Sequence, residues 1–214
     1  MTSLIDDPGP PTTQERYQRA TQSSNLRPTR VGTTGDVDVI GRQDPARDLP
    51  MRTDTIFRIY SMTKPIVSVA LMQFVERGAV LLRDPVAKYL PEFANPIVGI
   101  GGRAPNRAMT VQDLLRHTAG LTYEFHEPSP VRQLYAQAKL YSRQRSNADH
   151  VAELARLPLA HEPGSVWDYS RATDVLGRLV EVLGGAPLGA VLKAQVFDPL
   201  GMVDTGFEVP AEQH

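Results

Sequence analysis

Apolar residues recur at helical spacing from Phe57 onward, in runs that end at glycine or proline. The first run, residues 65–77, has an apolar residue every three to four positions and stops at Gly78. This spacing predicts an amphipathic helix, and a glycine is a typical helix end. The same pattern predicts further helices at 110–117, 129–141, 147–156, 170–183 and 187–197. The chain after Phe57 is therefore predicted to be mostly helical.

Local signals support three of these helix starts. Thr110 precedes Asp113 by three residues, which is the pattern of a capping box. Ser129 stands before a proline that suits the first turn, and Asn147 is the predicted cap of the next helix. Before Phe57, only residues 37–40 alternate in the manner of a short strand.

The composition fits one substantial domain, or a piece of a larger one. The chain has 214 residues, of which 41% are hydrophobic and 22% charged, close to the averages for globular proteins with a packed core. Residues 1–16 are rich in proline, threonine and aspartate, which predicts a mobile arm. Residues 17–214 are predicted to form one domain or part of one.

Charge and cysteine content exclude several classes of partner and site. The formal net charge is -1 and the charges are scattered, so no basic patch indicates nucleic acid or an anionic membrane. The chain has no cysteine, which excludes a thiol nucleophile, disulfides and thiolate metal sites. The N-terminus lacks the pattern of a signal peptide and no apolar run spans a bilayer, so a cytoplasmic location is predicted.

The tetrad Ser61-Met62-Thr63-Lys64 is the first candidate for chemistry. Residues three apart share a helix face, so the Lys64 amine can approach Ser61 as the base that a serine nucleophile needs. The tetrad is common by chance, and an N-cap serine with a solvated lysine is the alternative. The positions after Lys64 are nearly all apolar, however, which is an unusual setting for an exposed lysine. Ser61 and Lys64 are therefore candidate catalytic residues.

Tyr169 is the second candidate, in the segment PGSVWDYSRATDVLGRLVEVLGG. It stands just before a predicted helix, which can hold its phenol in a cleft. A phenol near a lysine can exchange protons with a nucleophile and a leaving group. The alternative is a boundary tyrosine with its hydroxyl in water. The neighbouring Trp167 is interpreted as a packing or rim residue.

The histidines indicate no metal site, and no cofactor is predicted. His126, His150 and His161 fall in loops or near helix ends without the i, i+4 spacing of a helical metal pair, and His214 is terminal. His117 is interpreted as structural. The sequence also has no G-x-S-x-G elbow, which disfavours an α/β-hydrolase, and no glycine loop for phosphate.

Four segments, in this order, resemble the class C β-lactamases, their DD-peptidase relatives and especially the class VIII carboxylesterases. They are TDTIFRIYSMTKPIVSVALMQFVERGAVLLRDPVAKYLPEF, MTVQDLLRHTAGLTY, PGSVWDYSRATDVLGRLVEVLGGAPL and FDPLGMVDTGF. The second is similar to the family's LL-x-H-T-S-G-L helix end, with Ala119 where serine is usual. The third is similar to the family's tyrosine motif. Together they cover most of residues 53–208.

The resemblance implies an α+β fold in which a helical region flanks a mostly antiparallel sheet, with this chain holding mainly the helices. It implies that Ser61 is acylated, that Lys64 activates it, and that Tyr169 is the second acid/base group. The N–H of Ser61 would be one oxyanion donor. The implied substrate is a small-molecule ester or amide, most simply a short-chain carboxylic ester, and no cofactor is required.

The chain departs from the family in three ways. Arg171 stands where β-lactamases keep an asparagine, which favours an esterase over a β-lactamase. Residues 17–52 show no clear match to the strands that precede the nucleophile. The sequence stops at His214, near half the family's usual length, so the K-T-G or H-x-G strand and most of the sheet are expected to be absent.

The missing sheet keeps alternative functions open. An apolar face without its cover is expected to favour self-association or pairing with another chain. Losing one oxyanion donor alone costs about 10²–10³ in rate. A catalytically silent fragment or interaction module is therefore one alternative to the esterase. A weak β-lactamase or DD-peptidase is another.

Overall fold

The computed structural model describes residues 39–141 and 145–209. The chain divides into two units, Met1–Arg58 and Ile59–His214. The predicted mobile arm, residues 1–16, lies outside the described residues. The helices and the candidate residues Ser61, Lys64 and Tyr169 all belong to the second unit.

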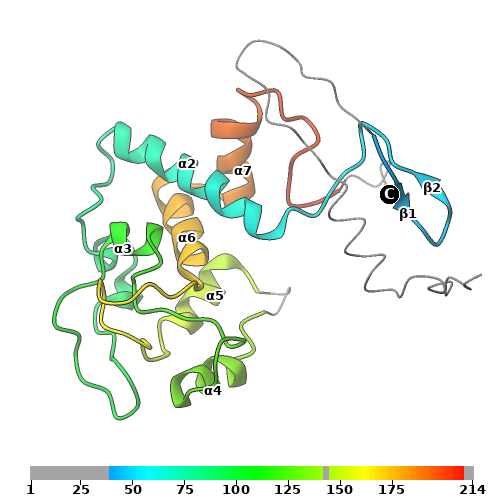
Figure 1. Ribbon diagram of the computed structural model, residues 1–214. Coiled ribbons are helices and arrows are strands. Elements are labelled where there is room, and N and C mark those ends of the chain that lie inside the picture. The colour runs from blue at the N-terminus through cyan, green and yellow to red at the C-terminus, as the bar shows by residue number, and fades with distance from the viewer. Residues whose placement is uncertain (1–38, 142–144, 210–214) are drawn as a thin grey trace, which may run out of the picture. The chain divides into compact units, whose positions relative to one another are not determined.

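The described part of the first unit is a small hairpin. Strand β1 (Arg42–Asp44) pairs antiparallel with β2 (Leu49–Pro50) (Figure 1). The Asp44 carboxylate closes the turn by accepting the backbone N–H groups of the residues two and three positions further on, at 2.9 and 3.2 Å. The strand predicted at 37–40 is wrong where it can be compared, because 39–40 carry no strand and 37–38 lie outside the described residues.

The second unit contains the predicted helices, joined by short helical turns. Their bounds are α2 (Thr63–Glu76), α3 (Val111–Leu115), α4 (Pro130–Gln137), α5 (Asn147–Leu154), α6 (Ala172–Gly184) and α7 (Leu188–Leu192). The turns are η1 (Tyr60–Met62), η2 (Val86–Lys88), η3 (Pro91–Phe93) and the π-helical turn η4 (Lys193–Phe197).

Helix ends differ from the prediction in three places. Helix α4 stops at Gln137, four residues early, and Lys139 just after it takes a left-handed φ of 47° that no helix can continue. Asn147 is the first residue of α5 and not its cap. Ser146 is the cap, because its hydroxyl accepts the Asp149 N–H at 3.1 Å. The predicted helix at 187–197 is split into α7 and η4.

Helix α6 is the centre of the second unit. It packs against α2, α3, α5 and α7 (Figure 1), and its buried side chains recur at helical spacing. They are Ala172, Val175, Leu176, Leu179 and Val180. Gly185 ends the helix with a φ of 64°, a left-handed conformation that glycine adopts without strain. Each buried valine or leucine contributes about 1.5–3 kcal/mol, and this burial holds α2, α3, α5 and α7 against α6.

Helix α2 lies across α6 and buries only one face. Val67, Ala70, Leu71 and Phe74 are buried at i, i+3, i+4 and i+7, whereas Val69 on another face is 51% exposed. The buried face fixes α2, and therefore the residues at its N-terminus, against the core. Self-association through the exposed face stays a prediction.

No single helix among the described residues is long and apolar enough to cross a membrane. One pair, Ala172–Gly184 with Leu188–Phe197, meets the length and composition criteria together but is bent by 74°.

Candidate active site

Ser61 and Lys64 come from the N-terminal end of α2. The turn η1 leads Ser61 into the helix, and Lys64 is the second residue of α2. Because the two residues lie three apart on one helical face, Lys64 Nζ donates a hydrogen bond to Ser61 Oγ at 3.1 Å. The partial positive charge of the helix N-terminus favours negative charge that develops near Ser61.

Tyr169 reaches the same hydroxyl from 108 residues further along the chain. Its phenol donates a hydrogen bond to Ser61 Oγ at 2.7 Å. Lys64 Nζ also lies 4.7 Å from the centroid of the Tyr169 ring, within the range of a cation–π interaction. The structure thus brings the three sequence-predicted residues together at one oxygen atom.

The electrostatics of the site act on the Tyr169 phenol. Burial raises the pKa of Tyr169, but hydrogen bonds with Lys64 and Ser61 and the positive charge of Lys64 outweigh it. The pKa therefore lies below its ordinary value of 10.0. Before the Ser61 proton can leave, the amine or the phenol must be deprotonated to receive it. A phenol with a lowered pKa reaches that form more easily.

Tyr60, directly before Ser61, has a strained backbone. Its φ is 43°, in the left-handed region, which costs a residue other than glycine about 1–2 kcal/mol. The Tyr60 side chain is 76% exposed, so its own packing does not explain this conformation. Backbone strain of this kind concentrates at functional sites, where the surrounding structure holds it.

Asp168, directly before Tyr169, is held from three sides. Its Oδ2 accepts a hydrogen bond from Arg132 Nη2 at 2.9 Å and lies 3.1 Å from His161 Nε2. Its Oδ1 lies 3.4 Å from His126 Nδ1. Asp168 is only 6% exposed, and a buried carboxylate needs such partners. These contacts fix the backbone that carries Tyr169.

The start of α3 and the loop before it are organised by a second buried carboxylate, Asp113, at the predicted capping box. Asp113 accepts two hydrogen bonds from Arg107, at 2.6 and 2.8 Å, and one each from the backbone N–H and the hydroxyl of Thr110. Thr118 Oγ1 donates another at 3.1 Å. Burial raises the pKa of Asp113, but the bonds from Arg107 and Thr110 lower it well below its usual range.

Arg171 is buried and bound to a carboxylate. It is 7% exposed, and its Nη2 lies 2.6 and 2.8 Å from the two carboxylate oxygens of Glu124. Its guanidinium also lies 5.2 Å from the centroid of the Tyr123 ring, which is 5.5 Å from the Tyr169 ring. The residue that stands in place of the family's asparagine is therefore linked to Tyr169 through the Tyr123 ring, and its guanidinium is paired with Glu124.

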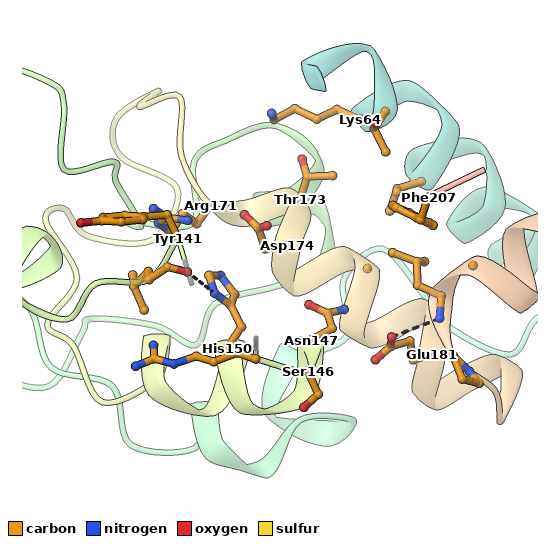
Figure 2. Close-up of a pocket in the computed structure, with 18 of the residues that line it drawn as sticks. Lys64, Tyr141, Ser146, Asn147, His150, Arg171, Thr173, Asp174, Glu181 and Phe207 are labelled. Atoms are coloured by element: carbon orange, nitrogen blue, oxygen red, sulfur yellow. Dashed lines mark hydrogen bonds between the residues drawn. The ribbon is translucent and has the colours of Figure 1, made fainter. Parts of the chain in front are cut away.

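A cavity of about 600 Å³ opens beside Lys64. Figure 2 shows Lys64 on one side of it, Thr173 and Asp174 of α6 in the middle, and Asn147 and His150 of α5 opposite Lys64. From the sequence, His150 was expected near a helix end and was not assigned to a site. Asn147 and His150 are spaced i, i+3, in line with the apolar positions of α5. This spacing could have predicted that both residues lie on the inner face of α5, where they line the cavity.

His126, His150 and His161 each have a partner within the fold. His126 and His161 contact Asp168, and His150 Nδ1 lies 2.9 Å from the Leu140 carbonyl oxygen. Within residues 39–141 and 145–209, no three His, Asp or Glu side chains gather as a metal site would require. His214 lies outside the described residues.

Asp168 and its partner Arg132 could not be found from the sequence. Only the fold brings α4, which carries Arg132, to the Tyr169 segment. No local signal marks either residue as part of the site.

Comparison with known proteins places the chain in a family. The Beta-lactamase family matches residues 18–214. Esterase EstB from Burkholderia gladioli is 41% identical over 169 residues, which cover 78% of this chain and 42% of that protein. The chain spans less than half the length of the curated relatives that it matches first.

Solved structures also resemble this chain. The structure of EstCE1, described as a hydrolase with promiscuous acyltransferase activity, is 34% identical with a TM-score of 0.67, over 75% of this chain and 42% of that one. A penicillin-binding protein from Bacillus halodurans is 24% identical with a TM-score of 0.65, over 85% of this chain and 54% of that one, and shows the fold alone. The chain has the helical part of the serine β-lactamase and penicillin-binding-protein fold, and it belongs to the Beta-lactamase family, as a relative of esterases and acyltransferases.

Proposed function

We propose that the chain hydrolyses carboxylic esters through an acyl-enzyme on Ser61. Ser61 Oγ attacks the ester carbonyl, its proton passes to Lys64 or Tyr169, and the alcohol leaves with a proton from the same pair. Water then gives a proton to the same pair and attacks the acyl carbonyl, the bond from that carbon to Ser61 Oγ breaks, and Oγ takes a proton back as the carboxylic acid leaves. The observation that carries the proposal is the convergence of Lys64 Nζ and the Tyr169 phenol on Ser61 Oγ, at 3.1 and 2.7 Å.

The relatives favour an ester as the substrate. EstB is named as an esterase, and EstCE1 is described as a hydrolase that also transfers acyl groups. Arg171 points the same way, because a guanidinium paired with Glu124 does not replace the asparagine side chain that the family resemblance assigns to lactam binding. The cavity beside Lys64 is large enough to receive the acyl or alcohol part of a small ester.

The test is covalent labelling. The chain, its Ser61→Ala variant and a control Ser68→Ala variant, changed two turns further along α2, are incubated with a fluorophosphonate and analysed by intact mass. We expect one adduct on the wild type and on Ser68→Ala, and none on Ser61→Ala. Equal labelling of all three chains, or no adduct on a chain that is folded by circular dichroism, would contradict the proposal and favour a catalytically silent fragment.

Lys64 is tested in the same assay. Lys64→Met should slow adduct formation by about 10²–10⁴, the usual contribution of a general base. Lys193→Met, which removes a lysine from η4, is the matched control and should label at the wild-type rate. A parallel incubation with penicillin separates the esterase from a weak β-lactamase or DD-peptidase, since only the latter two predict acylation of Ser61 by penicillin.

A further inference from the structure

His117 occupies the position at which α3 ends. Its N–H donates to the Leu114 carbonyl at 3.2 Å, and the N–H of Thr118 donates to the Asp113 carbonyl at 2.9 Å. These two bonds form the Schellman ending of a helix, in which the residue at the His117 position is left-handed and is usually glycine. The φ of His117 is 55°. A histidine here costs about 1 kcal/mol relative to glycine, so its side chain needs a separate explanation.

That side chain contacts the segment on both sides of Tyr169. The Ser170 N–H donates a hydrogen bond to His117 Nδ1 at 3.2 Å, and the Asp168 N–H donates to the His117 carbonyl at 2.9 Å. The imidazole ring lies 5.0 Å from the Tyr169 ring, centroid to centroid. One residue therefore accepts the N–H of the residue before Tyr169 and the N–H of the residue after it, and contacts the Tyr169 ring between them.

Only neutral His117 can make this arrangement. A backbone N–H can only donate, so Nδ1 must carry a lone pair and the ring proton must be on Nε2. The charged groups that act on His117 are Lys64 of α2 and Asp168 of the loop before α6, and the Tyr169 phenol also faces it. Burial and the charge of Lys64 lower the pKa of His117 from its ordinary value of 6.5, against the opposing effect of Asp168.

We propose that His117 is a positioning residue, which holds the Tyr169 phenol against Ser61 by accepting the Ser170 N–H, and does so only in its neutral form. The inference rests on the proposed function, because it assigns the role of His117 through Tyr169. This role goes beyond ending the helix. A glycine at position 117 would end α3 with less strain, but it would make no contact with Ser170.

Two variants separate the backbone from the side chain. His117→Gly keeps the left-handed conformation and the carbonyl bond to Asp168 but removes the acceptor. His117→Asn tolerates the same φ and has a side-chain oxygen that can accept the Ser170 N–H. We expect His117→Gly to slow fluorophosphonate labelling of Ser61 by about 10–10², as a misplaced catalytic group does, and His117→Asn to restore at least part of the rate.

The position of the phenol has a readout that does not depend on activity. Tyr169 is followed by carbon-13 NMR of labelled tyrosines, with Tyr169→Phe to assign its signal. Its pKa should move toward 10.0 in His117→Gly, because the phenol leaves Lys64 and Ser61, and should return toward the wild-type value in His117→Asn. Wild-type labelling should also slow as the pH falls through the pKa of His117, which lies below its ordinary value of 6.5, because protonated His117 cannot accept.

The outcomes distinguish this inference from the proposed function. If no chain is labelled, the proposed function fails, and the Tyr169 titration still decides the role of His117. If His117→Gly leaves both the Tyr169 pKa and the labelling rate unchanged, or if His117→Asn behaves no better than His117→Gly, the inference is overturned. Circular dichroism of each variant checks that a change does not arise from unfolding.

Discussion

The two sides of the candidate site are built in opposite ways. Ser61 and Lys64 are three residues apart on one helix, and their hydrogen bond follows from the geometry of α2. Tyr169 lies 108 residues further on, and its neighbours Asp168 and Ser170 are held by three separate segments, which contain His117, Arg132 and His161. The contact between Ser61 and Lys64 requires only that one helix is folded. The contact between Ser61 and Tyr169 requires most of the helical unit to be folded.

This difference means that the two sides respond differently to mutation. Substitutions far from Ser61 should leave the local Ser61–Lys64 pair intact, since α2 is fixed by its own buried face. The same substitutions should displace Tyr169 whenever they touch its supports. The most informative variants are therefore those that loosen one support of Tyr169 and leave α2 unchanged.

Asp113→Ala should have the largest effect on stability. It removes a fully buried carboxylate that binds Arg107, Thr110 and Thr118, so several donors lose their acceptor at once. We expect a loss of about 3–4 kcal/mol in the free energy of unfolding, measured by urea denaturation. The control is Asp198→Ala, which breaks an exposed ion pair with Lys193 and should cost about 0.5 kcal/mol or less. Similar losses in both variants would contradict the role given to Asp113.

Arg132→Met should have a smaller effect, about 2 kcal/mol, together with slower labelling of Ser61. The substitution removes the bond from Arg132 to the buried Asp168, and hydrogen bonds to charged groups contribute about 1.5–3 kcal/mol. Arg156→Met, in an exposed i,i+3 pair with Glu153, is the matched control and should change neither quantity. If Arg132→Met destabilises the chain but labels at the wild-type rate, Asp168 supports the fold without positioning Tyr169.

The smallest expected effect is a pH dependence of stability that comes from Asp168. Burial raises the pKa of Asp168, but hydrogen bonds with Thr122, Arg132 and His161 outweigh it, so the folded pKa lies below the ordinary value of 3.8. The ionised carboxylate then contributes stability that is complete above pH 3.8 and is lost as the pH falls through the folded pKa.

The measurement is the difference in denaturation midpoint between the wild type and Asp168→Asn at several pH values. This difference should be constant near neutral pH and should shrink as the pH falls below about 3.8. A difference that grows on acidification would mean that the carboxylate is not stabilised by these partners.

The helices could be predicted from the sequence because their signals are local. The apolar spacing of α2 and α6 and the capping box at Thr110 lie within one helix each, and the structure has these elements within a few residues of the predicted ends. The errors also have local causes. Ser146 and Asn147 are both good cap residues, and Lys139 ends α4 through a left-handed backbone that its sequence does not signal.

The candidate site was predictable only in part. The pair of Ser61 and Lys64 follows from helical spacing, and Tyr169 was placed beside them by family resemblance and not by any local rule. The supports of Tyr169 could not be predicted, because Asp168 meets Arg132 and His161 through tertiary contacts that no periodicity encodes. His117 was correctly placed at a helix end, but its bond to Ser170 depends on how α3 packs against α6.

The ion pair of Arg171 and Glu124 has a consequence for how such sites diverge. Because each side chain neutralises the other in a mostly buried setting, losing either one alone leaves an unpaired charge behind Tyr169. An evolutionary route between this arginine and the asparagine of the β-lactamases therefore needs two linked changes, with a less stable protein between them.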